Sequence, residues 1–390
     1  MTTPSGFRLT TIVAALLLAS TQVAHAEVTL IGTLQGTAHQ SNFANQQVSD
    51  IAGIVTAVSG NGFWMQDAGD GNALTSDAIF VFRGSTASKP LVGDAVQVSG
   101  LLQEFRPGSS GGTNNLTTTQ INAGGGAFTI DSSGNALPAA KVIGAGFLPP
   151  SAIAPNVGSL NTAPGYVLQP SQYAVDFYES LEGMRVSIPS AVSVGPRNSF
   201  GEIPVMSSLQ IGMPGIISAP RGGVVVGPGQ FNGQRIQLDD PLQLMSTPDV
   251  HSGAQLTDIV GVMDYSFGNF KLNVTQAVSV VSNTLTRETA SIGPGRIGVA
   301  SYNVENLGGV ANDANDLRIA NIAAQIKNTL GAPHIISLQE VQDNNGTGTG
   351  TGTGLCGDSS CSSNFLSCSS IVVAFCWLNE TRAGPDPSIG

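Results

Sequence analysis

Short apolar runs separated by turn residues dominate the first part of the chain. Five such runs alternate with Gly, Asn and Asp before residue 120, at residues 28–31, 51–58, 62–66, 78–82 and 95–102. Runs of this length with turn signals between them are typical of strands in a small barrel or sandwich. The pattern therefore predicts a β-domain over residues 27–125.

A second series of strand-like runs follows a stretch of weaker pattern. Residues 126–170 are rich in Gly, Ala, Ser and Pro and show little periodicity, so we expect them to form a connector. Strand-like runs return at residues 184–188, 191–194, 209–211, 223–226, 234–238, 256–263 and 271–274. These runs predict a second β-rich segment over residues 171–290.

The pattern changes after residue 287. An apolar run at residues 298–302 is followed by apolar residues at helical spacing over 317–330, a stop at Gly331 and a second buried-type run at 335–338. A strand, a helix and a strand in this order predict the opening of an α/β layer.

The first residues have the features of a secretory leader. Residues 1–26 contain the cationic Arg8, a short apolar run and the small-residue exit Ala24-His25-Ala26. The alternative is a membrane anchor, but the apolar run is much shorter than the roughly 20 residues that span hydrocarbon. We expect cleavage near Ala26, secretion of the mature chain, and no membrane span further along.

Composition narrows the classes of protein that fit. Only 11% of residues are charged, and 15 Lys and Arg against 26 Asp and Glu give a net charge of −11. This balance excludes a basic module that grips nucleic acid and a heptad-rich helical rod. With 41% hydrophobic residues and 49 Gly, the chain is expected to be a mainly β globular protein.

Two polar residues stand just past the ends of the last two predicted strands. Asn303 follows the first of these strands and Glu340 follows the second. If the strands are neighbours, an amide oxygen and a carboxylate converge, and such ligands suit Mg²⁺. The alternative is that Glu340 is an exposed acid at a strand end and Asn303 a turn former.

Several motifs together resemble bacterial secreted nucleases of the endonuclease/exonuclease/phosphatase superfamily, which has the deoxyribonuclease I-like fold. The motifs lie at residues 62–67, 76–82, 92–100, 178–184, 200–203, 264–268, 300–307 and 335–346. The resemblance implies an OB-like barrel, a second β segment, and a truncated α/β fragment of a four-layer sandwich over residues 297–346.

The same resemblance implies a chemistry. Glu340 would be the carboxylate ligand of a divalent metal, Mg²⁺ or alternatively Mn²⁺ or Ca²⁺, and Asn303 would help to position the metal and the scissile phosphate. The implied reaction is phosphodiester hydrolysis of extracellular DNA or RNA. The preference between DNA and RNA, the mode of cleavage and the oligomeric state stay open.

The chain departs from that superfamily in its last part. The family requires two histidines after the glutamate, but no histidine follows His334. A complete domain of this type runs to roughly 250 residues, far more than remain here. We therefore expect an inactive chain with its metal weakly bound or absent. The alternatives are a non-catalytic secreted module that binds nucleic acid or a surface partner, and a related phosphatase.

Residues 347–390 have a different composition from the rest of the chain. A Gly-Thr alternation ends at Gly354, and all four cysteines follow it, Cys356, Cys361, Cys368 and Cys376. We hypothesise that the reading frame shifted near residues 346–355 and that this tail is aberrant. The alternatives are two disulfides of unknown connectivity and, less favoured by the spacing, a zinc site.

The first β-domain also offers candidate nucleic-acid contacts. Phe63 and Trp64 could stack on bases if the domain binds single strands, with Arg83 nearby for a phosphate. Strand alternation says that some of these aromatic residues belong to the core. His39 and His251 stand alone in polar loops, and we expect both to be solvated.

Overall fold

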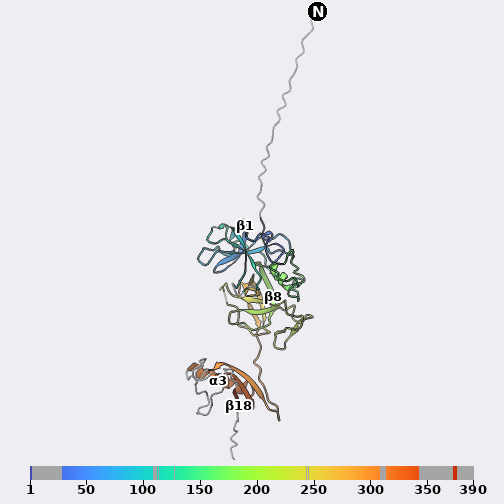
Figure 1. Ribbon diagram of the computed structural model, residues 1–390. Helices are drawn as coiled ribbons and strands as arrows, with labels where there is room; N and C mark the ends of the chain where they lie inside the picture. Colours follow the sequence, from blue (N-terminus) through green and yellow to red (C-terminus); the bar gives the residue numbers. More distant parts are fainter. Residues whose placement is uncertain are drawn as a thin grey trace, which may run out of the picture. The chain divides into compact units, whose positions relative to one another are not determined.

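The computed structural model describes residues 1, 29–108, 112, 114–126, 128–242, 244, 246–307, 313–341 and 372–375. It divides into two compact units, an N-terminal unit of Met1–Leu285 and a C-terminal unit of Thr286–Gly390 (Figure 1). The predicted leader, apart from Met1, lies outside the described residues, and so do the four cysteines of the tail. The described part is mainly β, as the sequence pattern predicted.

The first half of the N-terminal unit is a barrel, which we call the first barrel. It contains α1 (Ile31–Gln35), β1 (Gln47–Val58), β2 (Gly62–Gln66), β3 (Ala78–Phe82), β4 (Ala95–Phe105), β5 (Thr118–Asn122) and β6 (Phe128–Ser132). The strand order β1-β2-β3-β5-β4 closes into a ring because β1 also pairs with β4. Within the ring β3 and β5 run parallel, and the other pairs are antiparallel.

Strand alternation sorts the side chains of the first barrel into an inner and an outer face. Phe63, Met65, Ile79 and Val81 point inward and are fully buried in one core with Ile31 of α1. Their neighbours on β2, β3 and β5 point outward. The row Trp64, Phe80 and Gln120 crosses these three strands in register.

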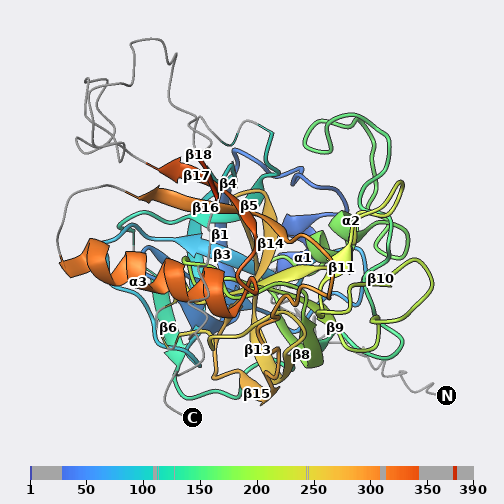
Figure 2. The ribbon, with the colours of Figure 1, turned by 90° about the horizontal axis from the view of Figure 1, so that it is seen from below.

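The second half of the N-terminal unit is a further barrel, the second barrel. It contains β7 (Lys141–Val142), α2 (Ala174–Glu179), β8 (Arg185–Ser193), β9 (Ile203–Ser207), β12 (Ile236–Asp239), β13 (Gln255–Ser266), β14 (Asn269–Val274) and β15 (Ser279–Ser282). A small hairpin, β10 (Ile217–Ser218) with β11 (Val224–Val225), interrupts the path from β9 to β12 (Figure 2).

The two barrels share one topology. In the second barrel the order β8-β9-β12-β14-β13 closes because β13 also pairs with β8, and β12 runs parallel to β14. The strands β8, β9, β12, β13 and β14 therefore occupy the same places in this ring as β1, β2, β3, β4 and β5 do in the first barrel. Each barrel is also preceded by a short helix whose apolar side chains join its core, Ile31 and Leu34 in α1, and Phe177 and Tyr178 in α2. The chain therefore contains the same β architecture twice.

The two barrels touch through a small apolar cluster. Trp64 and Phe80 of the first barrel pack with Leu242 and Val262 of the second. A buried hydrogen bond from the Thr119 backbone N–H to Glu182 Oε1, 2.9 Å long, joins them at another point. These contacts hold the outer face of the first barrel against the second barrel.

The C-terminal unit contains β16 (Val299–Leu307), α3 (Asp313–Asn328), β17 (Ile335–Val341) and β18 (Val372–Phe375). The predicted strand, helix and strand are present, and β16 pairs with β17 in parallel. The strand β18 falls in the tail predicted to be aberrant and pairs antiparallel with β17, so the three strands lie side by side (Figure 2).

The expectation of a deoxyribonuclease I-like sandwich is wrong. In the described part of the chain, helix is confined to α1, α2 and α3, and the sheet with β16 and β17 has 3 strands. An α/β sandwich requires sheets covered by several helices. The strands β6 of the first barrel and β7 of the second lie within residues 126–170, which the sequence analysis expected to form a connector.

Gly62 allows the aromatic row on the outer face of the first barrel. A Cβ atom there would overlap the Val81 carbonyl oxygen and lie 2.5 Å from Phe80 Cζ. We expect Gly62→Ala to displace the Phe80 ring and to lower the free energy of unfolding by about 1–3 kcal/mol, as overpacking does.

The matched control for this change is Gly60→Ala. In the same turn, a Cβ on Gly60 would meet no atom within 4 Å. Urea unfolding of both variants checks the expectation, and equal unfolding midpoints for the two would contradict it.

Candidate functional site

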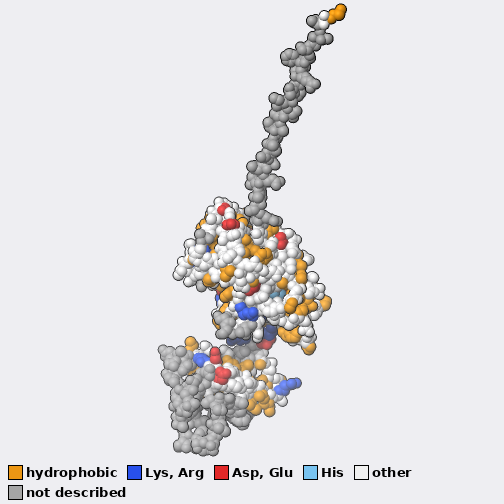
Figure 3. Space-filling model, turned by 45° about the horizontal axis from the view of Figure 1, so that its top comes forward, with side chains coloured by type: hydrophobic (Ala, Val, Ile, Leu, Met, Phe, Trp, Pro, Cys, Tyr) orange, Lys and Arg blue, Asp and Glu red, His pale blue; other side chains and the backbone are white. Residues whose placement is uncertain are grey.

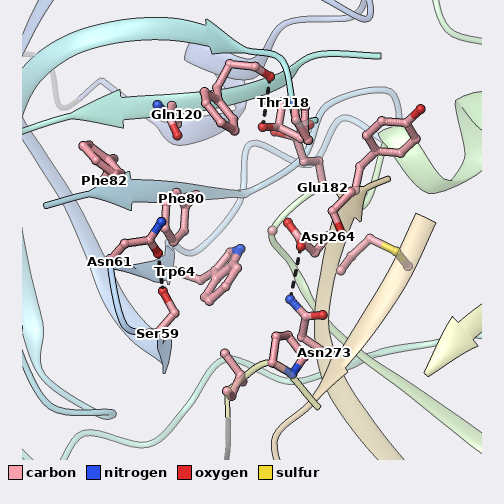
Figure 4. A pocket seen from close by; sticks show the side chains of 18 of the residues that line it. Ser59, Asn61, Trp64, Phe80, Phe82, Thr118, Gln120, Glu182, Asp264 and Asn273 are labelled. Carbon is pink, nitrogen blue, oxygen red and sulfur yellow. Dashed lines mark hydrogen bonds between the residues drawn. The ribbon is translucent and has the colours of Figure 1, made fainter. Parts of the chain in front are cut away.

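A cleft of about 600 Å³ opens between the outer face of the first barrel and the outer face of the second (Figure 4). This volume lies within the range of small-molecule sites. The first barrel contributes Ser59, Gly60, Asn61, Trp64, Phe80, Phe82, Gln103, Phe105, Pro107, Thr118, Gln120 and Asn122. The remaining walls come from Glu182, Gly183, Pro241, Leu242, Met263, Asp264, Tyr265, Ser266 and Asn273.

Aromatic side chains form one wall of the cleft. The Trp64 and Phe80 rings lie 4.7 Å apart between centroids at an angle of 55°. Phe82 is half-buried, and Phe105 is 50% exposed. All four point outward from the first barrel, because they occupy alternate positions on β2, β3 and β4. The wall is therefore a direct product of strand periodicity.

Amide side chains stand beside these rings. Gln120 pairs with Phe80 across β3 and β5, and Asn122 pairs with Phe82. On the opposite side, Asn273 Nδ2 donates a hydrogen bond of 3.2 Å to Asp264 Oδ2. The cleft thus combines apolar ring surface with neutral groups that both donate and accept hydrogen bonds.

The charge of the cleft is low and acidic. Glu182 and Asp264 are its charged residues, and no Lys or Arg occurs among the lining residues that the structure describes. Burial raises the pKa of Asp264, and burial together with the nearby Glu179 raises the pKa of Glu182 well above its ordinary value. Both shifts reduce negative charge. Charged side chains are also sparse on the surface in Figure 3.

The three predicted nucleic-acid contacts do not come together. Phe63 has no exposed surface and belongs to the core of the first barrel, so the prediction that it stacks on a base is wrong. Trp64 does line the cleft, although it is only 6% exposed. Arg83 is buried elsewhere, where its guanidinium donates to the Ser88 and Gly126 carbonyls.

Asn303 and Glu340 do converge, as predicted if their strands were neighbours. Asn303 Nδ2 donates to Glu340 Oε1 over 2.8 Å, and Asn303 Oδ1 accepts from the Glu305 backbone N–H over 2.7 Å. The amide oxygen that a cation would need is therefore engaged by the backbone within β16, where the register of this strand with β17 shifts. Within the described residues, no three His, Cys, Asp or Glu side chains form a group that could hold a metal ion.

A buried ionic cluster around His39 was missed by the sequence analysis. His39 Nε2 lies 2.8 Å from Asp176 Oδ1, and His39 Nδ1 lies 3.2 Å from Glu179 Oε2. Tyr166 donates its hydroxyl to the second oxygen of Asp176. The prediction that His39 is solvated is therefore wrong.

The surroundings of His39 favour its charged form. Burial alone lowers the pKa, but the carboxylates of Glu179 and Asp176 outweigh it and raise the pKa of His39 to about 9. Conversely, burial raises the pKa of Glu179. We name these residues, with Tyr166, the histidine cluster; it ties the segment after α1 to α2 and does not line the cleft.

Comparisons with known proteins give a limited result. Residues 142–284 match the model of a family described as a domain of unknown function (DUF8508). This stretch corresponds closely to the second barrel. No curated protein and no solved structure matches the chain. Together with the mainly β fold, this result overturns the resemblance to deoxyribonuclease I-like nucleases, because the matched family has no known function and the sandwich is absent from the described residues.

The sequence predicted that no segment after the leader spans a membrane, and the described helices can be compared with this prediction. None of the helices in the described ranges is both long and apolar enough to cross a bilayer.

Proposed function

We propose that the N-terminal unit is a non-catalytic binding module and that its cleft holds an uncharged ligand. The observation that carries this proposal is the lining: aromatic rings and neutral amides, without a Lys or Arg among the described lining residues. A concave, mostly apolar site with a few polar groups is the usual form of a small-molecule site.

The topology of the first barrel supports the same location. The ring order with β3 parallel to β5 is compatible with the OB-like barrel expected from the sequence. OB-like barrels bind oligonucleotides and oligosaccharides on the face of strands 2 and 3. The cleft residues Trp64, Phe80 and Phe82 lie on the corresponding strands β2 and β3.

Nucleic acid, the other partner expected from the sequence, fits this cleft less well. Binding of the phosphodiester backbone of a nucleic acid depends on Lys and Arg that displace counterions. Here the lining carries Glu182 and Asp264 instead, and the whole chain has a net charge of −11. Of the two partners expected for a non-catalytic module, we therefore favour the surface partner over nucleic acid. The predicted leader at residues 1–26 supports an extracellular setting.

Saturation-transfer NMR with a library of uncharged fragments and an oligothymidylate tests the proposal. Thr118→Trp fills the cleft from β5, whereas Thr129→Trp places the same side chain on the exposed β6, outside the cleft. We expect uncharged fragments to bind the wild type and Thr129→Trp, and to lose at least about tenfold in affinity, roughly 1.4 kcal/mol, with Thr118→Trp.

Three results would count against the proposal. Binding of the oligothymidylate alone, weakened by salt, would identify a nucleic-acid module instead. Fragment binding that survives Thr118→Trp would place the site elsewhere. Absence of any binding to the wild type would remove the site altogether.

A further inference from the structure

Three amide side chains in the cleft have hydrogen-bonding atoms without a hydrogen-bond partner in the described part of the chain. Gln120 is only 6% exposed, yet within the described residues its amide has no hydrogen-bond partner. Asn273 is 1% exposed, and its Oδ1 has no hydrogen-bond partner among the described residues. Asn61 Oδ1 accepts from Ser59 Oγ over 2.9 Å, while no described residue accepts from its Nδ2.

The Asn273 Oδ1 atom is both buried and unpaired among the described residues, and such an atom requires an explanation. A buried amide without its hydrogen bonds costs roughly 1–3 kcal/mol, so native structures rarely leave one unpaired. Asn273 and Gln120 stand on opposite sides of the cleft, one on β14 and the other on β5. A ligand between them would satisfy both, and it must supply a donor to Asn273 Oδ1.

From these groups we infer that the ligand is a carbohydrate, a conclusion that rests on the proposed function of the cleft. A sugar ring carries hydroxyl groups that donate and accept at its edge, which matches amides that do both. Its C–H faces are apolar and can pack on the rings of Phe80 and Phe82. A neutral sugar also needs no cation from the lining.

Other ligand classes leave part of the cleft unsatisfied. A hydrocarbon chain would cover the aromatic wall, but it would leave the Gln120 and Asn273 amides buried without partners. A phosphorylated ligand would meet Glu182 and Asp264 and no basic side chain among the described lining residues. A neutral, polyhydroxylated ligand satisfies the aromatic wall, the amides and the charge together.

Isothermal titration calorimetry of the full chain tests the inference. The probes are neutral oligosaccharides of glucose, galactose, mannose and N-acetylglucosamine. We expect at least one of them to bind, and Gln120→Leu and Asn273→Leu each to weaken its binding by about tenfold through the loss of one or two hydrogen bonds. The control Gln97→Leu changes a β4 residue outside the cleft and should bind as the wild type does.

The possible results separate the inference from the proposed function. If uncharged fragments bind in a way that depends on Thr118 but no oligosaccharide does, the inference falls and the binding module stands. If an oligosaccharide binds equally well to Gln120→Leu and Thr118→Trp, its site is elsewhere and both fall. Should Asn273→Leu fail to fold by circular dichroism, Gln120→Leu alone decides.

Discussion

His39 is expected to contribute about 3 kcal/mol of stability at pH 6 that is lost by pH 10, and His39→Gln to lack this contribution. The pKa of His39 rises from its ordinary 6.5 to about 9 in the folded chain. A shift of this size corresponds to about 3 kcal/mol, because each unit is worth about 1.4 kcal/mol. His39 is fully buried, so solvent does not screen the interaction.

The sign follows from which state binds the proton more tightly. The folded state holds the His39 proton more tightly than the unfolded state does, so the stabilisation is complete below about pH 6.5 and is lost as pH rises through about 9. The raised pKa values of Glu179 and Glu182 act in the same direction, since their protonated forms are also favoured by burial.

Urea unfolding at a series of pH values measures this effect. Glu182 is present in both proteins, so the difference in slope between the wild type and His39→Gln isolates the contribution of the histidine cluster. Equal slopes for the two proteins would mean that the imidazole is neutral in the folded state. His251→Gln is the control, because His251 is exposed and belongs to a loop outside the cluster.

Much of the architecture could be predicted from local pattern, because strand periodicity is a local property. Apolar runs indicated β2, β3 and β4, and helical spacing indicated α3 between two parallel strands. Even the meeting of Asn303 with Glu340 followed from the rule that neighbouring parallel strands end at one edge. What alternation could not decide is which face of β2 points into the first barrel, so Phe63 and Trp64 were left equivalent, although Phe63 lies in the core of that barrel and Trp64 lies on its outer face, in the cluster between the barrels.

Contacts between residues far apart in the chain could not be predicted from local sequence pattern, for a physical reason. Asp176 stands 137 residues from His39, and nothing local marks a histidine as the partner of acids so far away. Ring closure in both barrels likewise depends on pairings of distant strands, β1 with β4 and β8 with β13. The resemblance to nucleases misled because a strand, a helix and a strand occur in many folds and do not define one.

The repeated topology gives the cleft its two sides. Outward positions on the first barrel supply Trp64, Phe80 and Gln120, and outward positions on the second supply Asp264 and Asn273. Inward neighbours such as Met263 and Leu272 belong to the core of the second barrel. A site built between two such faces has its shape fixed by strand pairing in both barrels, which favours a ligand that fits a preformed cleft.

Phe63→Ala should be among the most destabilising substitutions in the chain, whereas Phe105→Ala should hardly affect stability. Phe63 is fully buried, and removing a buried phenyl group costs about 3–5 kcal/mol in lost burial and cavity formation. Phe105 is 50% exposed at the cleft, and substitutions at such positions usually change stability by less than about 0.5 kcal/mol.

Phe105→Ala should weaken ligand binding more than Phe63→Ala does, which is the reverse of their expected effects on stability. Phe105→Ala removes ring surface from the cleft wall and should lower the affinity for an oligosaccharide severalfold. Phe63 does not line the cleft, so Phe63→Ala should bind almost as the wild type does under conditions where it stays folded. Urea unfolding and calorimetry on each variant provide the two measurements. Similar stability losses at both positions would show that the outer and inner faces of β2 and β4 have been assigned wrongly.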